Sequence, residues 1–259
     1  FSAGPSILPQ SVITNASKKI LEFDNELSIL EISHRSNAFT DVMSESISLV
    51  RDILDVPSNY SIVFLQGGAS LQFCMVALNL LKKNNGSAAY LNTGTWSKKA
   101  IFEAKKFGDI EIVGDSSHKN FNYIPKDFII SDTHDYFHCT SNNTIYGSQI
   151  NTFPECNIPV VCDMSSDIFS RKIDVNKFGL IYAGAQKNLG PAGATLVIVK
   201  DEILGKSERD IPSMLDYRTH IDKKSMFNTP PVFSVYVSML NLRWLKSKGG
   251  LGYIENNNN

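Results

Sequence analysis

The sequence has little excess charge and no apolar segment long enough to cross a membrane. Its 259 residues carry a formal net charge of −1, and there is no long run of basic residues. A near-neutral chain does not favour binding to nucleic acid or to an anionic membrane surface, and short, interrupted apolar stretches predict no transmembrane helix. Residues 1–5 also lack the basic and apolar regions of a signal peptide. We therefore expect a cytoplasmic protein that binds small molecules.

Cysteine is scarce, and its spacing does not predict a metal site. The four cysteines are Cys74, Cys139, Cys156 and Cys162. None belongs to a C-x-x-C pair, and all lie in or beside apolar stretches, which is typical of buried, reduced thiols in a cytosolic protein. His138 precedes Cys139 in a predicted strand, so the two side chains point to opposite faces of the sheet. We expect no metal in this protein.

Short apolar runs alternate with helical patterns along the chain. Strands are predicted at 61–65, 88–91, 109–113, 135–140, 159–163, 180–183 and 194–199, and helices at 11–26, 41–54, 71–81, 97–107 and 232–248. This alternation favours the α/β class, with a mostly parallel sheet covered by helices on both faces. In such sheets ligands gather at the carboxyl ends of the strands. The glycine-rich turn 67–70, Asp163 and the turn around Lys187 would all lie at that edge.

The domain prediction divides the chain near residue 250. Residues 1–250 contain the alternating pattern and are expected to form one large domain. Residues 251–259 end in a run of asparagines. Such a run has little apolar surface to bury, so a disordered tail or a linker is expected there, with the start of a further, small domain as the alternative.

Lys187 is the most informative single residue. It lies in the run Ala-Gly-Ala-Gln-Lys-Asn-Leu-Gly-Pro, residues 183–191, between two apolar strands. Lysine is rarely held inside a packed domain, and burial lowers the pKa of its ammonium group, which makes it a nucleophile and a base. Such lysines form Schiff bases, above all with pyridoxal 5'-phosphate (PLP). A solvated turn lysine is the commoner case, so the interpretation depends on other residues.

Three other features supply what PLP requires. Gly67 and Gly68 follow a strand and open a helix, where backbone N–H groups can hold a phosphate. Asp163 ends an apolar strand and could pair with the pyridine nitrogen. Trp96 offers a flat face for stacking, and Gly94 just before it allows close approach of the backbone. Taken singly, an ordinary βα turn, a helix N-cap and a core tryptophan remain alternatives, but together these residues favour a PLP site.

Two further segments have the composition of anion-binding sites. Arg35 can bind a carboxylate or a phosphate through its planar fork, and His34 beside it can add a donor. A surface salt bridge is the alternative for this arginine. Asn228 and Thr229 precede two prolines at a predicted helix start, which is another place where phosphate binds.

The chain resembles the phosphoserine aminotransferases, which are PLP-dependent enzymes of fold type I within the class V aminotransferases. The matching blocks are residues 1–5, 33–35, 56–60, 66–68, 159–166, 182–191 and 226–231. The run Gly-Ala-Gln-Lys-Asn together with Phe-Asn-Thr-Pro-Pro is specific to this group. The resemblance implies an α/β/α sandwich on a mostly parallel sheet.

The resemblance also implies roles for individual residues around PLP. Lys187 would form the Schiff base and then carry the proton between substrate and cofactor, while Asp163 would pair with the pyridine nitrogen. The remaining contacts would come from Trp96 on the ring, Thr144 near the ring hydroxyl, and Ala69, Ser70 and Gln186 on the phosphate.

Further implied roles concern the substrate and a second subunit. His34 and Arg35 would bind the substrate's phosphate or carboxylate. Asn228 and Thr229 would reach the cofactor phosphate of a partner subunit, so a homodimer is implied. The implied ping-pong reaction moves the amino group of glutamate to 3-phosphohydroxypyruvate, giving O-phosphoserine and 2-oxoglutarate in L-serine biosynthesis.

The chain departs from the family pattern in two places. Ser70 and Leu71 stand in the phosphate loop, where the family has an arginine or small residue and then a glycine. The small C-terminal domain of the family, with its substrate-binding arginine, is expected to be largely absent. Two alternatives stay open: another class V enzyme, such as a different aminotransferase or a cysteine desulfurase, and a non-catalytic remnant.

Overall fold

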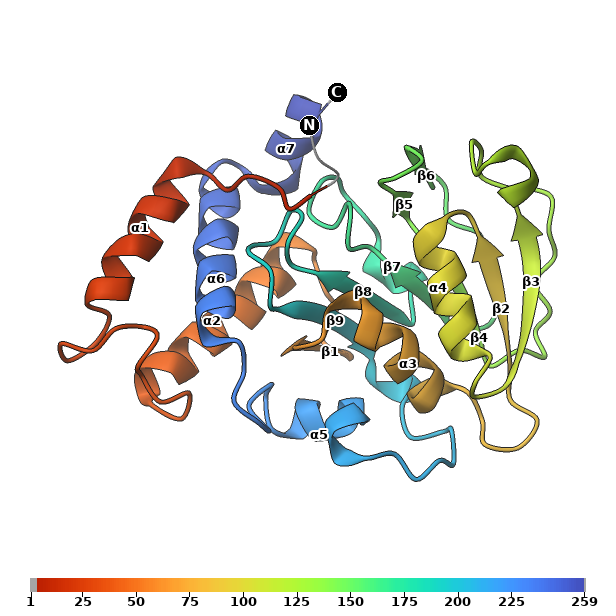
Figure 1. The fold of residues 1–259 in the computed structure, drawn as a ribbon, viewed down its shortest axis with the longest axis horizontal. Coiled ribbons are helices and arrows are strands. Elements are labelled where there is room, and N and C mark those ends of the chain that lie inside the picture. Colours follow the sequence, from red (N-terminus) through yellow and green to blue (C-terminus); the bar gives the residue numbers. More distant parts are fainter. Residues whose placement is uncertain (1–3, 259) are drawn as a thin grey trace.

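The computed structural model describes residues 4–258, and its centre is a seven-stranded sheet (Figure 1). The strands are β1 (Tyr60–Leu65), β2 (Ser87–Asn92), β3 (Asp109–Asp115), β4 (Tyr136–Thr140), β7 (Val160–Asp163), β8 (Leu180–Gly184) and β9 (Thr195–Lys200). Their order across the sheet is β1-β9-β8-β7-β4-β2-β3. The first three residues of the motif at 1–5 lie outside the described part.

The predicted α/β class with a mostly parallel sheet is confirmed. Strands β8, β7, β4, β2 and β3 run parallel to one another, and β9 alone runs in the opposite direction, pairing antiparallel with both β1 and β8. Most strands are buried on both faces, which explains why they appear in the sequence as continuous apolar runs.

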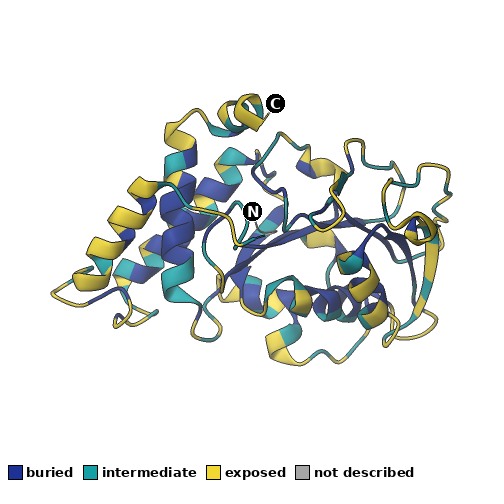
Figure 2. Cartoon of the chain, turned by 45° about the horizontal axis from the view of Figure 1, so that its top comes forward, coloured by how far each residue is buried: buried dark blue, intermediate teal, exposed yellow. Residues whose placement is uncertain are grey.

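Helices cover both faces of the sheet, and together they form two separate apolar cores. On one face lie α1 (Gln10–Leu21), α2 (Asn37–Ile53), α6 (Val232–Ser247) and α7 (Gly250–Asn258). On the other lie α3 (Gly68–Leu80), α4 (Thr95–Ala104) and α5 (Tyr217–Asp222). Figure 2 shows the buried strands between these two layers.

Helix boundaries differ from the predictions where local chemistry decides them. Helix α2 begins before residue 41 because the Ser36 side chain accepts a hydrogen bond from the backbone N–H of Phe39. Helix α1 ends at Leu21, well before residue 26, because Asn25 and Glu26 have positive φ angles and form a tight turn.

Two predictions fail in segments that lack a strong pattern. The short hairpin of β5 (Asn142–Asn143) and β6 (Ser148–Gln149) was not predicted. The expected disordered tail is wrong for residues 251–258, which belong to helix α7 (Gly250–Asn258). That helix places Leu251 in the core formed with α6, and Asn258 donates a hydrogen bond to the Ser170 carbonyl. In the described part of the chain, no helix is long and apolar enough to cross a membrane.

Candidate active site

The carboxyl ends of β1, β7 and β8 meet at one edge of the sheet, as the sequence predicted. Gly67 follows β1, Asp163 ends β7, and the turn with Lys187 follows β8. Hydrogen bonds connect the ends of β7 and β8: the backbone N–H of Ser165 donates to Asp163 Oδ1 at 2.9 Å, and the Gly184 N–H donates to Ser165 Oγ at 3.0 Å. The acid and the lysine turn are therefore held by the same loop.

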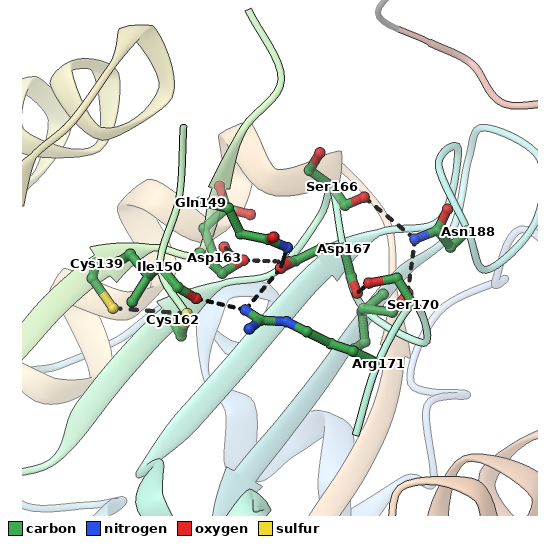
Figure 3. Close-up of polar contacts among 12 residues, drawn as sticks. Cys139, Gln149, Ile150, Cys162, Asp163, Ser166, Asp167, Ser170, Arg171 and Asn188 are labelled. Atoms are coloured by element: carbon green, nitrogen blue, oxygen red, sulfur yellow. Dashed lines mark hydrogen bonds and ion pairs between the residues drawn. The ribbon is translucent and has the colours of Figure 1, made fainter. Parts of the chain in front are cut away.

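Lys187 is half-buried in the turn between β8 and β9. Burial lowers the pKa of its ammonium group, and Nζ lies 3.4 Å from Thr144 Oγ1. Asn188 fixes the turn, because its side chain donates to the Ser166 carbonyl at 3.3 Å (Figure 3). The carbonyl of Asn188 in turn accepts from the side chain of Asn241 on α6, at 2.8 Å. The structure thus places Thr144, in the turn between β5 and β6, beside Lys187.

The N-terminal segment lies directly against this lysine. A Cβ added to Gly4 would be 2.9 Å from both Cε and Nζ of Lys187, and Gly4 also has a φ of +139°. The backbone N–H of Ser6 donates to the Gln186 carbonyl at 2.9 Å. The sequence analysis did not anticipate this contact, because nothing in the pattern of residues 4–9 points to a position 180 residues away in the chain.

Asp163 is buried, with 4% of its surface exposed, on the face of the sheet under α3 and α4. Burial raises its pKa to about 6, the Ser165 side chain and backbone N–H act in the opposite direction, and nearby Asp167 adds to the rise. A buried carboxyl group with a raised pKa is stabilised in its ionised form by a neighbouring cation. A protonated pyridine nitrogen would be such a cation.

Helix α3 begins three residues earlier than predicted, directly on the glycine pair. Gly67 precedes it in the left-handed conformation (φ +84°), and a Cβ there would be 2.6 Å from Leu71 Cβ. The first N–H groups of a helix have no intrahelical partner, so Gly68, Ala69 and Ser70 present theirs at the strand edge. Leu71, the departure from the family pattern, packs beneath Gly67 and leaves this helix start intact.

Gln186 and Trp96 lie near the same edge, but neither is packed into the core. A Cβ on Gly184 would be 2.6 Å from Gln186 Oε1, so the glutamine side chain folds back over the strand end. Trp96 is 36% exposed, and Lys99 Nζ lies 4.8 Å from its ring centroid. The interpretation of Trp96 as a core residue is therefore wrong. A Cβ on Gly94 would lie 2.3 Å from the Asn143 side chain, which accounts for that glycine.

His34, Arg35, Asn228 and Thr229 lie outside this cluster. His34 and Arg35 are in the loop between α1 and α2, which Figure 1 shows at the left, away from the centre of the sheet. Arg35 is exposed and makes no ion pair with any described residue, so the surface salt bridge is not found. The Thr229 carbonyl accepts a hydrogen bond from the Gln66 side chain, which places residues 228–229 beside the start of α3.

The cysteines are not arranged as nucleophiles. Cys139 and Cys162 are buried, on the sheet face opposite to Asp163. Burial raises the pKa of Cys74, Cys156 and Cys162, and a thiol with a raised pKa is a poor nucleophile. This arrangement disfavours a cysteine desulfurase.

Several buried polar atoms at this edge lack a partner among the described residues. They include the hydroxyl oxygens of Thr140 and Thr195, whose side chains lie on the same face as Asp163. Buried polar groups without hydrogen bonds are uncommon and call for an explanation. A half-buried lysine, a buried acid and a helix start at one strand edge fit PLP, and a polar ligand would account for such atoms.

Comparison with known proteins gives a consistent result. The family model for class-V aminotransferases matches residues 1–259. A phosphoserine aminotransferase of Flavobacterium johnsoniae is 61% identical over 261 residues, covering 100% of this chain and 73% of that protein. Among solved structures, phosphoserine aminotransferase from Bacillus circulans subsp. alkalophilus is 41% identical with a TM-score of 0.95, covering 100% of this chain and 72% of its own. The PLP-bound enzyme from Trichomonas vaginalis is 34% identical with a TM-score of 0.93, with coverage of 100% and 73%.

Proposed function

This chain belongs to the class-V aminotransferase family, and we propose that it is a PLP-dependent transaminase acting on phosphoserine. It would move the amino group of glutamate to 3-phosphohydroxypyruvate, giving O-phosphoserine and 2-oxoglutarate in L-serine biosynthesis. The observation that carries the proposal is a half-buried lysine on a turn that a shared loop connects to a buried acid. Residues 1–250 would form the large domain, and the cytoplasm is the proposed location.

Residues at the strand edge would hold the cofactor. Lys187 would bind the aldehyde and Asp163 the pyridine nitrogen. The other contacts would come from Trp96 on the ring, Thr144 near the ring hydroxyl, and Ala69, Ser70 and Gln186 on the phosphate. When bound, PLP supplies the electron sink that lets a carbon–hydrogen bond next to the amino group break.

Lys187 would move the proton in this reaction. Its lowered pKa increases the neutral amine fraction, which is the form that attacks a carbonyl or accepts a proton. Thr144 keeps Nζ at the strand edge, and Gly4 closes one side of it. A base that is held close to the reacting carbon has only a short distance over which to move the proton.

Asn228 and Thr229 would serve a second subunit. Their segment is partly exposed beside α3, and the Gln66 side chain holds it through the Thr229 carbonyl. An exposed, anchored polar segment is available to reach the cofactor phosphate of a partner subunit. We therefore propose a homodimer with shared active sites.

His34 and Arg35 would bind the phosphate or carboxylate of the substrate. The support is local: Arg35 is exposed without an ion pair among the described residues, and His34 Nε2 is a buried atom without a partner there. Arg35→Ala should raise KM for the phosphorylated substrate about tenfold or more while PLP occupancy stays unchanged. Equal loss of substrate affinity and PLP occupancy would mean that Arg35 is structural.

The decisive experiment is an absorption spectrum of the purified chain with PLP, before and after glutamate or O-phosphoserine is added. We expect a visible band from lysine-bound PLP that the amino donors discharge. A band that neither donor discharges would mean that the chain binds the cofactor without transamination. Absence of the band with excess PLP would contradict the proposal, and sulfur release from cysteine without activity on phosphoserine would favour a desulfurase.

A further inference from the structure

The hairpin of β5 and β6 carries Thr144, and a buried carboxylate outside the hairpin holds its base. Asp167, in the loop after β7, has 5% of its surface exposed. Its Oδ1 accepts a hydrogen bond from the hydroxyl of Ser141, the residue before β5. Its Oδ2 accepts one from Gln149 Nε2 on β6, at 3.1 Å. One carboxylate therefore binds the hairpin where the chain enters it and where the chain leaves it.

Arg171 completes this arrangement, which we call the hairpin clamp and define as the side chains of Asp167 and Arg171. Arg171 Nη2 lies 3.2 Å from Asp167 Oδ2 and also donates at 2.7 Å to the carbonyl of Ile150, directly after β6. The Ile150 N–H in turn donates to the Ser141 carbonyl at 2.7 Å. Figure 3 shows Gln149 and Arg171 converging on Asp167. The ion pair is therefore part of the base of the hairpin.

The tip of the hairpin meets the same loop after β7. Thr144 Oγ1 lies 2.7 Å from the hydroxyl oxygen of Ser166, the residue before the clamp's acid, and 3.4 Å from Lys187 Nζ. Asn143 donates to Thr93 Oγ1, in the loop before α4, at 3.0 Å. The tip thus lies between two loops, and the hairpin clamp fixes the side of the hairpin that faces the lysine.

Stability alone does not account for the clamp. A buried ion pair adds little net stability, because the attraction between its charges is offset by their loss of hydration. We propose that Asp167 and Arg171 are positioning residues that set Thr144 against Lys187 by holding the base of the hairpin. The role rests on the proposed function, in which Thr144 and Lys187 hold PLP, but the placement of Thr144 does not require the cofactor.

A second explanation is that Asp167 acts through its charge. Burial raises the pKa of Asp163, and the charge of Asp167 adds to that rise. Asparagine at position 167 separates the two explanations. Its amide oxygen can accept from both Arg171 and Gln149, and its NH2 group can donate to the Ser141 hydroxyl oxygen. Asp167→Asn therefore keeps the geometry of the clamp and removes the charge.

The test is methyl NMR of the full chain without cofactor, labelled in its threonine methyl groups. In Asp167→Ala the order parameter of the Thr144 methyl group should fall by about a third, the difference between a rigid and a flexible group. Asp135→Ala is the matched control. The Asp135 side chain is 6% exposed and pairs with Lys82 at 3.1 Å, but it precedes β4, at the opposite end of the strands from the site. This control should leave the Thr144 methyl group unchanged.

Asp167→Asn should retain the order parameter of the unsubstituted chain. In the PLP-loaded protein, Asp167→Ala should lower kcat by about tenfold to a hundredfold and leave KM for glutamate within about twofold, because displacement of a group at a reacting site slows the reaction more than it weakens binding. Equal order parameters in Asp167→Ala and Asp135→Ala would overturn the inference. A fall in Asp167→Asn as large as in Asp167→Ala would also overturn it and assign the effect to charge.

If Asp167→Ala does not fold, Gln149→Ala decides instead. It removes one donor at the base of the hairpin and leaves the ion pair in place, so the order parameter of the Thr144 methyl group should fall by a smaller amount. An unchanged order parameter would overturn the inference. Failure of transamination in the unsubstituted chain would instead refute the proposed function and leave the NMR result interpretable.

Discussion

The two faces of the sheet differ sharply, although the same strands build both. Phe137, Cys139, Cys162 and Ile181 point into the core formed with α1, α2 and α6. Their immediate neighbours in sequence point to the other face: His138, Thr140, Asp163 and Tyr182 lie under α3 and α4. Both faces carry an apolar core, but the face under α3 and α4, here called the polar face, also holds a buried acid, a neutral histidine and hydroxyls that have no partner among the described residues.

This difference shows which face contributes less to the stability of the folded state. An apolar face contributes to folding in proportion to the area it buries. The polar face contains groups that are costly to bury without partners, and Asp163 is held there at a raised pKa. Substitutions on the two faces should therefore separate effects on activity from effects on folding.

The largest effect on the polar face should come from Lys187→Ala. Transamination should fall by at least about a thousandfold, because this is the residue that we propose binds the cofactor and carries the proton. A half-buried turn lysine contributes little packing, so thermal unfolding should change little. Steady-state kinetics beside a thermal melt measures both. Retention of transamination in this variant would mean that the assigned lysine is wrong.

Ile181→Ala tests the apolar face one residue away from Tyr182. Ile181 is 1% exposed, and loss of its buried side chain should lower the free energy of unfolding by about 2–5 kcal/mol. Urea unfolding measures this change. The pH dependence of kcat should stay as it is in the parent chain, and a shifted profile would show that the two faces are coupled.

Asp163→Asn should stabilise the cofactor-free protein while it slows the reaction. The pKa of Asp163 in the folded state is raised to about 6, so the folded state favours the protonated carboxyl. The stability that this group contributes is fully present below its unfolded-state pKa near 4 and is lost as pH rises through 6. The variant should therefore exceed the parent by roughly 3 kcal/mol at pH 8 and not at pH 4. Melts at both pH values decide this, and equal stability at pH 8 would contradict the raised pKa.

The smallest effect should come from Cys162→Ala. Its sulfur lies 3.8 Å from that of Cys139 within the apolar face, and truncation should cost about 1 kcal/mol of unfolding free energy. Both kcat and PLP occupancy should be unchanged. A large loss of activity with intact folding would restore the case for a reactive cysteine.

Much of the fold was predictable because the strands are short apolar runs bounded by turn residues. Their alternation with helices indicated a mostly parallel sheet, and it placed Asp163 and Lys187 at one edge. The antiparallel course of β9 was not predictable, because an apolar strand carries no mark of its direction. Helix α7 was missed because the asparagine run at its end predicted disorder. The helix is stabilised by Leu251, which packs into the core formed with α6.

The site was only partly predictable, because local patterns in the sequence do not report contacts between distant segments. Residues with rare chemistry in a tight turn, such as Lys187, are visible in the sequence. Contacts across the sheet are not, because they depend on register: Tyr182 and His138 appear in sequence only as members of apolar strands. Gly4 lies against Lys187 through a contact between distant segments. No local pattern reports such a neighbour.

The position of β1 at the edge of the sheet has a consequence for the way the chain is made. Its one neighbour in the sheet, β9, is the last of the seven strands in the chain, and Ser61 and Asp201, which bond across this pair, are 140 residues apart. At roughly 5–20 residues per second, the ribosome needs roughly 7–28 s to deliver that partner. For that time β1 is an apolar strand with an unpaired edge, a template on which another nascent chain can pair. Pairing with β9 therefore ends the period in which neither edge of this apolar strand has a partner.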